Sequence, residues 1–179
     1  MPKTATEVVK LLDVEQLEVN LFRGAQPENS RLTRVFGGQV AGQAVRAALK
    51  TVPADRRLHS LHVYFLLGGD PAVPIIYDVE NVRDGRSFTT RRVSARQHGQ
   101  VIFFMTASFQ VVEDGWEHQD PMPVTTAPDQ AHALPDLIAM MDQKAAEEWR
   151  EEWGGFEARY IGEPRAEDDP TRQDKAVVQ

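Results

Sequence analysis

Hydrophobic residues alternate with polar residues through the middle of the chain, in segments of strand length. The alternation predicts four strands, at residues 57–67, 75–83, 87–97 and 100–112. The pairs Asp84-Gly85 and His98-Gly99 are typical of tight turns, so the last three strands should form an antiparallel meander. One face of the last strand should pack against a helix, and it carries Val101, Phe103, Met105, Ala107 and Phe109.

A run of small residues with helical character follows Phe36-Gly37-Gly38 and covers residues 38–51, ending before Pro53. Its Gly, Ala and Val residues would let a sheet wrap closely around it. Weaker helical spacing is present at 6–16 and 134–153, and short extended segments follow at 17–24 and 156–161. The pattern predicts an α+β fold in which an antiparallel sheet wraps around a long central helix.

Composition is typical of a globular protein that can bury a core. The chain has 179 residues, of which 41% are hydrophobic and 26% are charged. No apolar stretch approaches the roughly 20 residues of a membrane span and no signal-peptide core is present, so we expect a cytoplasmic protein that does not contact a membrane. The absence of cysteine excludes disulfides and thiolate chemistry, and the net charge of −7 argues against nucleic-acid binding.

Several dispersed motifs between about Leu11 and Pro128 resemble, in their order, those of the acyl-CoA thioesterase II family. They are Leu21-Phe22-Arg23-Gly24, Phe36-Gly37-Gly38-Gln39, Pro74-Ile75-Ile76-Tyr77-Asp78-Val79, Arg83-Asp84-Gly85-Arg86-Ser87-Phe88 and Met105-Thr106-Ala107-Ser108-Phe109-Gln110. Members are double hotdogs, two tandem copies of a helix wrapped in an antiparallel sheet. The resemblance implies hydrolysis of fatty acyl-CoA to free fatty acid and coenzyme A in lipid metabolism, without a metal or organic cofactor.

The length of the chain accommodates one hotdog and part of another. The resemblance implies an N-terminal hotdog at residues 1–128, a linker and connecting helix at 129–155, and the beginning of a second, incomplete hotdog at 156–179. The chain is therefore expected to be truncated, with a mobile polar stretch at 163–174. We expect it to form a homo-oligomer or to associate with a second hotdog domain.

Thioester hydrolysis needs an activated water and N–H donors for the oxyanion. The predicted helix at 38–51 contains no Asp or Glu. In the family the catalytic Asp, with a Thr and a Gln that help to hold the water, belongs to the second copy, which lies beyond Gln179. This chain alone should therefore be a weak or inactive hydrolase.

The start of the central helix is the candidate substrate-binding segment. Phe36, Gly37 and Gly38 could bring backbone N–H groups close to an acyl thioester, and Gln39 adds a neutral donor and is a candidate catalytic residue. Alternatively, the two glycines serve only turn geometry and tight helix–sheet packing.

Two further residues are candidates for the site. His59 should share the inward strand face with Leu61 and Val63, where it could act as a base, as a donor or as a packing residue. Arg91 belongs to a cluster with Arg83, Arg86, Arg92 and Arg96, which could bind coenzyme A phosphates or could be the exposed charges of a hairpin.

Two classes of function remain open from the sequence. The first is the acyl-CoA thioesterase. The second is a non-catalytic hotdog that acts as an acyl-binding or assembly module. A hotdog dehydratase is disfavoured, because no inward pair of a histidine and a carboxylate is evident.

Overall fold

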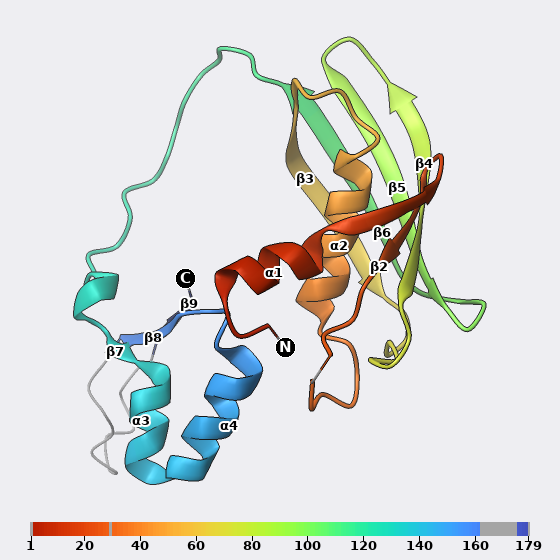
Figure 1. Ribbon diagram of the computed structural model, residues 1–179. Coiled ribbons are helices and arrows are strands. Elements are labelled where there is room, and N and C mark those ends of the chain that lie inside the picture. Colours follow the sequence, from red (N-terminus) through yellow and green to blue (C-terminus); the bar gives the residue numbers. More distant parts are fainter. Residues whose placement is uncertain (1, 29, 162–174, 179) are drawn as a thin grey trace. The chain divides into compact units, whose positions relative to one another are not determined.

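The computed structural model describes residues 2–28, 30–161 and 175–178, and the chain forms two compact units (Figure 1). One unit is Val9–Trp116, and the other combines Met1–Val8 with Glu117–Gln179. The domain boundaries expected at residues 128 and 155 stay predictions, and the stretch 163–174 lies outside the described residues.

The helices and strands follow one another in the order expected for a sheet wrapped around a helix. The helices are α1 (Ala5–Leu12), α2 (Gly37–Leu49), α3 (Leu134–Met141) and α4 (Gln143–Trp153), with a 3-10 turn η1 (Pro128–Gln130). The strands are β1 (Val14–Glu18), β2 (Leu21–Gly24), β3 (Arg56–Phe65), β4 (Ile75–Asp84), β5 (Phe88–Gln97), β6 (Gln100–Val111), β7 (His132–Ala133), β8 (Ala158–Ile161) and β9 (Lys175–Val178).

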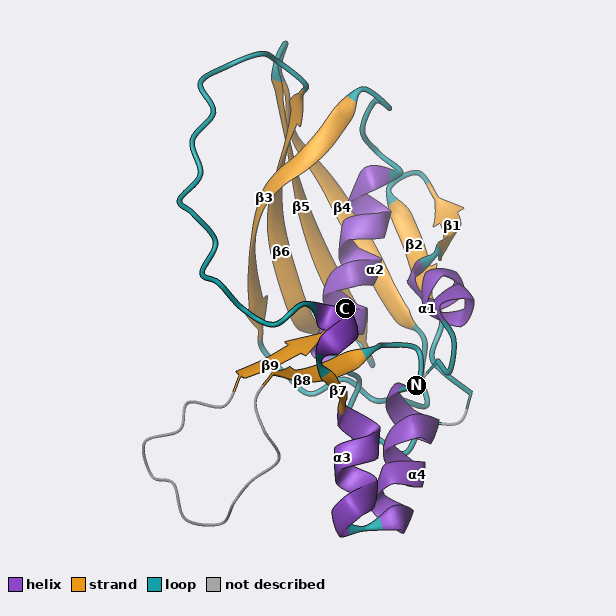
Figure 2. Cartoon of the chain, turned by 90° about the vertical axis from the view of Figure 1, so that its left-hand side faces the viewer, coloured by secondary structure: helices purple, strands orange, loops and turns teal. Residues whose placement is uncertain are grey.

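The unit Val9–Trp116 is a six-stranded antiparallel sheet in the order β1-β2-β4-β5-β6-β3, and the sheet curves around α2 (Figure 2). This arrangement confirms the predicted α+β fold and the meander of the last three strands. The turn between β5 and β6 has positive φ at both His98 (50°) and Gly99 (76°), as a tight hairpin requires.

The core of this unit lies between α2 and the inner face of the sheet. The helix contributes small side chains, including Ala44, Ala47 and Ala48, all fully buried. The sheet contributes large ones, such as Met105 and Phe109. Because the side chains on the helix are small, the helix axis can lie close to the strands. The large side chains of the sheet then fill the space around it.

Two predicted helices differ from the structure. The helix expected at 6–16 ends at Leu12, because Val14 is buried in the core and pairs with Gly24 as the first residue of β1. The helix expected at 134–153 is two helices. Asp142 between them has extended backbone, and its carboxylate accepts the N–H groups of Lys144 and Ala145 as the N-cap of α4.

The second unit contains α3, α4 and a small antiparallel sheet in the order β7-β8-β9. Its N-terminal part is joined to its C-terminal part by the Gly155 N–H, which donates to the Pro2 carbonyl at 3.0 Å. None of the described helices is long and apolar enough to cross a membrane.

Candidate functional site

An apolar groove of about 370 Å³ lies at the start of α2 in the unit Val9–Trp116. Three segments distant in sequence form it: the approach to α2 with its first turn, the end of β3 with the loop that follows, and the beginning of β6. Its lining residues are Arg34, Val35, Gly37, Val40, Phe65, Leu66, Leu67, Gly68, Gly69, Ile102 and Phe103. Most of the lining side chains are aliphatic or aromatic, and the volume is within the range of small-molecule sites.

The two glycines at the start of α2 are each in contact with an aromatic ring. A Cβ atom added at Gly37 would lie 3.0 Å from the Phe65 ring, and one added at Gly38 would lie 2.5 Å from the Phe36 ring. No side chain of a described residue caps this helix terminus, and the first intrahelical bonds are donated by Gln39 and further residues. Gly37 lines the groove, whereas Phe36 and Gly38 are not among its lining residues. Tight packing and N–H donation are compatible roles for the two glycines, and the substrate-binding role of this segment stays a prediction.

The loop after β3 forms one wall of the groove and is fixed from several sides. The N–H groups of Leu66 and Leu67 both donate to the Ile102 carbonyl, at 2.9 and 3.1 Å. Gln97, which is buried, accepts the Asp70 N–H at 2.8 Å and donates to the Asp70 carbonyl at 2.8 Å. The pKa of the Asp70 carboxyl is lowered, mainly by the hydrogen bond from the Ala72 N–H and to a smaller extent by the hydrogen bond with His98. The wall is therefore pre-formed.

Gln39 is buried against the segment that follows β2. Its amide nitrogen donates to the Ala25 carbonyl at 3.2 Å and to the Gln26 side-chain oxygen at 2.9 Å. One helical turn later, Gln43 donates to the same Ala25 carbonyl and accepts the Tyr77 hydroxyl at 2.8 Å. Both glutamines tie α2 to its surroundings, and the catalytic role of Gln39 stays a prediction.

His59 does not point toward α2, so its predicted orientation is wrong. The pairing of β3 with β6 shifts between Leu58 and Ser60, which places a β-bulge at His59 and reverses the alternation there. The His59 ring lies 2.8 Å from the Ser108 hydroxyl and makes an edge contact with Phe88 on the outer face of the sheet. His59 is not among the residues that line the groove, to which β3 contributes only Phe65 at its other end, and the catalytic role of His59 stays a prediction.

Val101 is a second correction of the same kind. The register of β5 with β6 shifts between Ala95 and Arg96, and Ile102 becomes the extra residue. Ile102 is buried and reaches the groove, whereas Val101 is only half-buried and pairs with the exposed Arg96. The alternation predicted for Phe103, Met105, Ala107 and Phe109 is confirmed, since all four are buried.

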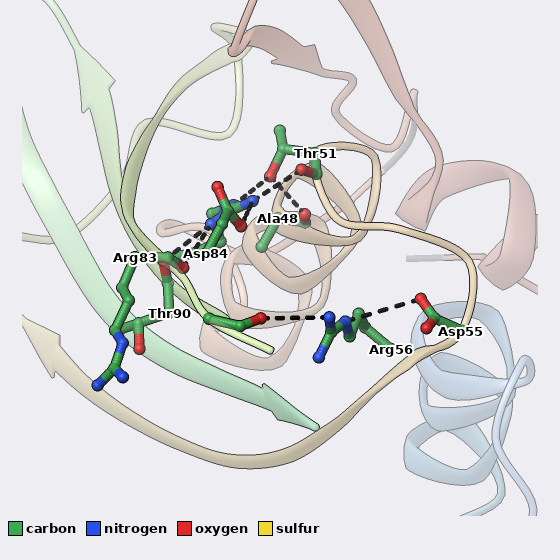
Figure 3. Close-up of polar contacts among 9 residues, drawn as sticks. Ala48, Thr51, Asp55, Arg56, Arg83, Asp84 and Thr90 are labelled. Carbon is green, nitrogen blue, oxygen red and sulfur yellow. Dashed lines mark hydrogen bonds and ion pairs between the residues drawn. The ribbon is translucent and has the colours of Figure 1, made fainter. Parts of the chain in front are cut away.

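Arg91 is the most completely buried charged residue among those described, and it lies at the far end of α2 from the groove. Its guanidinium uses all five N–H donors, on the Thr51 hydroxyl and carbonyl, the Arg83 and Thr90 carbonyls and the Asp84 carboxylate (Figure 3). The Thr51 hydroxyl in turn donates to the Ala48 carbonyl at the end of the helix. This geometry leaves no donor for a phosphate, and the substrate-binding role of Arg91 stays a prediction without support from the contacts.

A second depression, of about 520 Å³, lies on the outer face of β4 and β5. Polar and charged side chains dominate its lining, which comprises Asn20, Asp78, Val79, Glu80, Asn81, Arg92, Ser94 and Arg96. Arg92 and Glu80 pair across it at 3.5 Å. Because charges of both signs face each other there without an apolar wall, the groove beside α2 is the better candidate. No cluster of three potential metal ligands occurs among the described residues.

Sequence reasoning missed Arg34, Gln43 and Gln97. Periodicity could have identified Gln43 and Gln97, because each falls on the inward face of a helix or strand. Gln43 comes one helical turn after Gln39, and Gln97 alternates with Val93 and Ala95. No periodic pattern could have identified Arg34, since it precedes the helix in an irregular segment.

Residues 26–110 match the family model described as the acyl-CoA thioesterase N-terminal domain. The chain is 40% identical to acyl-CoA thioesterase 2 of Haemophilus influenzae over 169 residues, which is 92% of this chain and 59% of that protein. The chain thus spans little more than half the length of this relative.

Solved structures give the same family. Acyl-CoA thioesterase II TesB2 from Mycobacterium marinum matches with a TM-score of 0.70 and 40% identity, over 93% of this chain and 56% of that chain. A hotdog-fold protein from Alicyclobacillus acidocaldarius, 20% identical with a TM-score of 0.66, covers 87% of this chain and 55% of that chain and supports the fold alone. The chain belongs to the acyl-CoA thioesterase II family, with a hotdog that matches the N-terminal domain of its members.

Proposed function

We propose that the chain is the N-terminal hotdog of an enzyme that hydrolyses fatty acyl-CoA to free fatty acid and coenzyme A. The observation that carries the proposal is the apolar groove that reaches the first turn of α2. Relatives named acyl-CoA thioesterases support this substrate class over a non-catalytic assembly module. The expected setting is fatty acid metabolism in the cytoplasm.

In the proposed complex the acyl chain lies against Phe65, Leu66 and Phe103, and the thioester carbonyl faces the start of α2. Attack of water on the carbonyl carbon forms a tetrahedral oxyanion, which then expels the coenzyme A thiolate. Backbone N–H groups at Gly37 and Gly38 would stabilise that oxyanion, because a helix N-terminus carries partial positive charge.

The group that activates the water must come from outside α2, because this helix contains neither Asp nor Glu. We propose that a second hotdog domain supplies the carboxylate, while this chain supplies the groove and the N–H donors. No metal or organic cofactor takes part in the proposed reaction.

The first test is binding of S-decyl-coenzyme A, a thioether that cannot be hydrolysed. The chain should bind it, and Gly37→Val should weaken binding by about tenfold or more, since the new side chain would meet the Phe65 ring. Gly115→Val is the matched control, because a Cβ atom at Gly115 has no neighbour within 4 Å. Calorimetric titration measures both affinities, and a wild-type chain without affinity would contradict the proposal.

The same material should release little thiol from decanoyl-CoA. Ellman's reagent reports only coenzyme A here, because the chain has no cysteine. Rapid turnover by protein that intact-mass analysis shows to be free of any other chain would refute the division of roles, and Gln39→Ala and His59→Ala would then be the first variants to assay.

The edge strand β3 is the proposed association surface. Within the described residues it pairs only with β6, and it exposes apolar side chains on both faces, with Leu61, Tyr64 and Phe65 between 44% and 58% exposed. We expect sedimentation velocity to show a dimer or larger species, and Leu61→Lys to shift it toward monomer. Val19→Lys, at a 74% exposed position away from this edge, should leave the distribution unchanged. A wild-type monomer at high micromolar concentration would contradict this.

A further inference from the structure

We infer that Arg34 binds the phosphates of the coenzyme A moiety at the mouth of the groove beside α2. The inference rests on the proposed function and adds the residue that would hold the charged half of the substrate. It follows from the composition of the groove, from the contacts of Arg34 there and from the partners that Arg91 and Arg92 have elsewhere.

Arg34 is the only charged side chain among the described residues that line the groove; its neighbours there are aliphatic, aromatic or glycine. Its guanidinium has no hydrogen bond or ion pair with any described residue. A single cation beside an apolar groove is suited to a ligand that has an apolar acyl chain and an anionic group. Arginine suits this task, because its planar donors bind phosphate oxygens in pairs.

The backbone around Arg34 is fixed to the groove wall. The Val35 N–H donates to the Gly69 carbonyl at 2.9 Å. The side chain of Arg34 packs on Gly68 so closely that a Cβ atom there would lie 2.8 Å from its Cδ atom and 3.2 Å from its Nε atom. The aliphatic part of Arg34 therefore rests on the loop, and its charged end is exposed to solvent beside the groove.

The two neighbouring arginines Arg91 and Arg92 of β5 have partners elsewhere. Arg91 uses all five donors inside the protein, and Arg92 pairs with Glu80 on the outer face of the sheet. Since the whole chain carries a net charge of −7, a polyanionic ligand gains no attraction from the protein as a whole and needs a local cation. Arg34 provides that cation at the groove.

Two thioethers separate the contribution of the phosphates from that of the acyl chain. S-decyl-coenzyme A carries both, whereas S-decyl-N-acetylcysteamine keeps the chain and lacks the phosphates. By calorimetry, Arg34→Gln should weaken binding of the first by about tenfold or more and leave binding of the second unchanged. Arg23→Gln, at an exposed arginine of β2 that pairs with Glu15, is the matched control and should behave like wild type with both ligands.

Salt dependence gives a measurement that does not rely on the folding of a variant. Wild-type affinity for S-decyl-coenzyme A should fall as salt rises, and affinity for the phosphate-free ligand should not. Equal effects of Arg34→Gln on both ligands, or no effect on either, would overturn the role of Arg34 while leaving the groove intact. Failure of the wild-type chain to bind either ligand would instead overturn the proposed function.

Discussion

Replacing Arg91 by methionine should lower the free energy of unfolding by about 3 kcal/mol. The substitution keeps much of the volume and removes every donor of the guanidinium, which is 2% exposed. Three backbone carbonyls, of Thr51, Arg83 and Thr90, would then be left without this partner. Asp84 contributes less to the loss, because it is 58% exposed and water can solvate it.

Arg92→Met is the matched control for Arg91→Met. Arg92 is the next residue of the same strand, but it lies on the outer face and pairs with Glu80 at 3.5 Å with both side chains more than half exposed. Its loss should change stability by less than about 1 kcal/mol. Urea denaturation followed by circular dichroism compares the two. Equal midpoints for both variants would show that the buried contacts of Arg91 do not stabilise the fold.

Truncating Phe103 to alanine should destabilise the protein by about 3–5 kcal/mol. Phe103 is 1% exposed and lies between the sheet and α2. The centroid of its ring is 5.1 Å from that of the Phe65 ring. Its removal leaves a cavity that a close-packed core refills only in part. The same urea titration measures the effect.

Phe104→Ala provides the comparison for Phe103→Ala at the adjacent position. Phe104 points to the outer face, is half-buried and stacks on Tyr64 with ring centroids 4.8 Å apart. Its truncation should cost about 1 kcal/mol, the usual contribution of an aromatic pair. If Phe104→Ala were the more damaging of the two, the assignment of the inner and outer faces of β6 would be wrong.

The site was only partly predictable from the sequence. The Phe36-Gly37-Gly38 segment is recognisable by its position before a helix of small residues, and its Gly37 lines the groove. His59 was misplaced because a bulge depends on how β3 pairs with β6, and its partner Ser108 is 49 residues away in the chain. The arginine cluster of the hairpin leaves phosphate binding and exposed charge open for Arg91 and does not predict its burial, although Arg91 alternates with the inward Val93 and Ala95.

The sequence by itself determined the elements that rest on local periodicity: the central helix, the four long strands, and the inward face of β6 from Phe103 to Phe109. These follow from side-chain spacing, which neighbouring residues set. Only the tertiary structure decided where bulges interrupt that spacing, which charges are buried and where a groove opens. Each of these depends on the register between distant strands and on the approach of α2 to the sheet. The groove in particular joins Arg34, Phe65 and Ile102, which no local pattern connects.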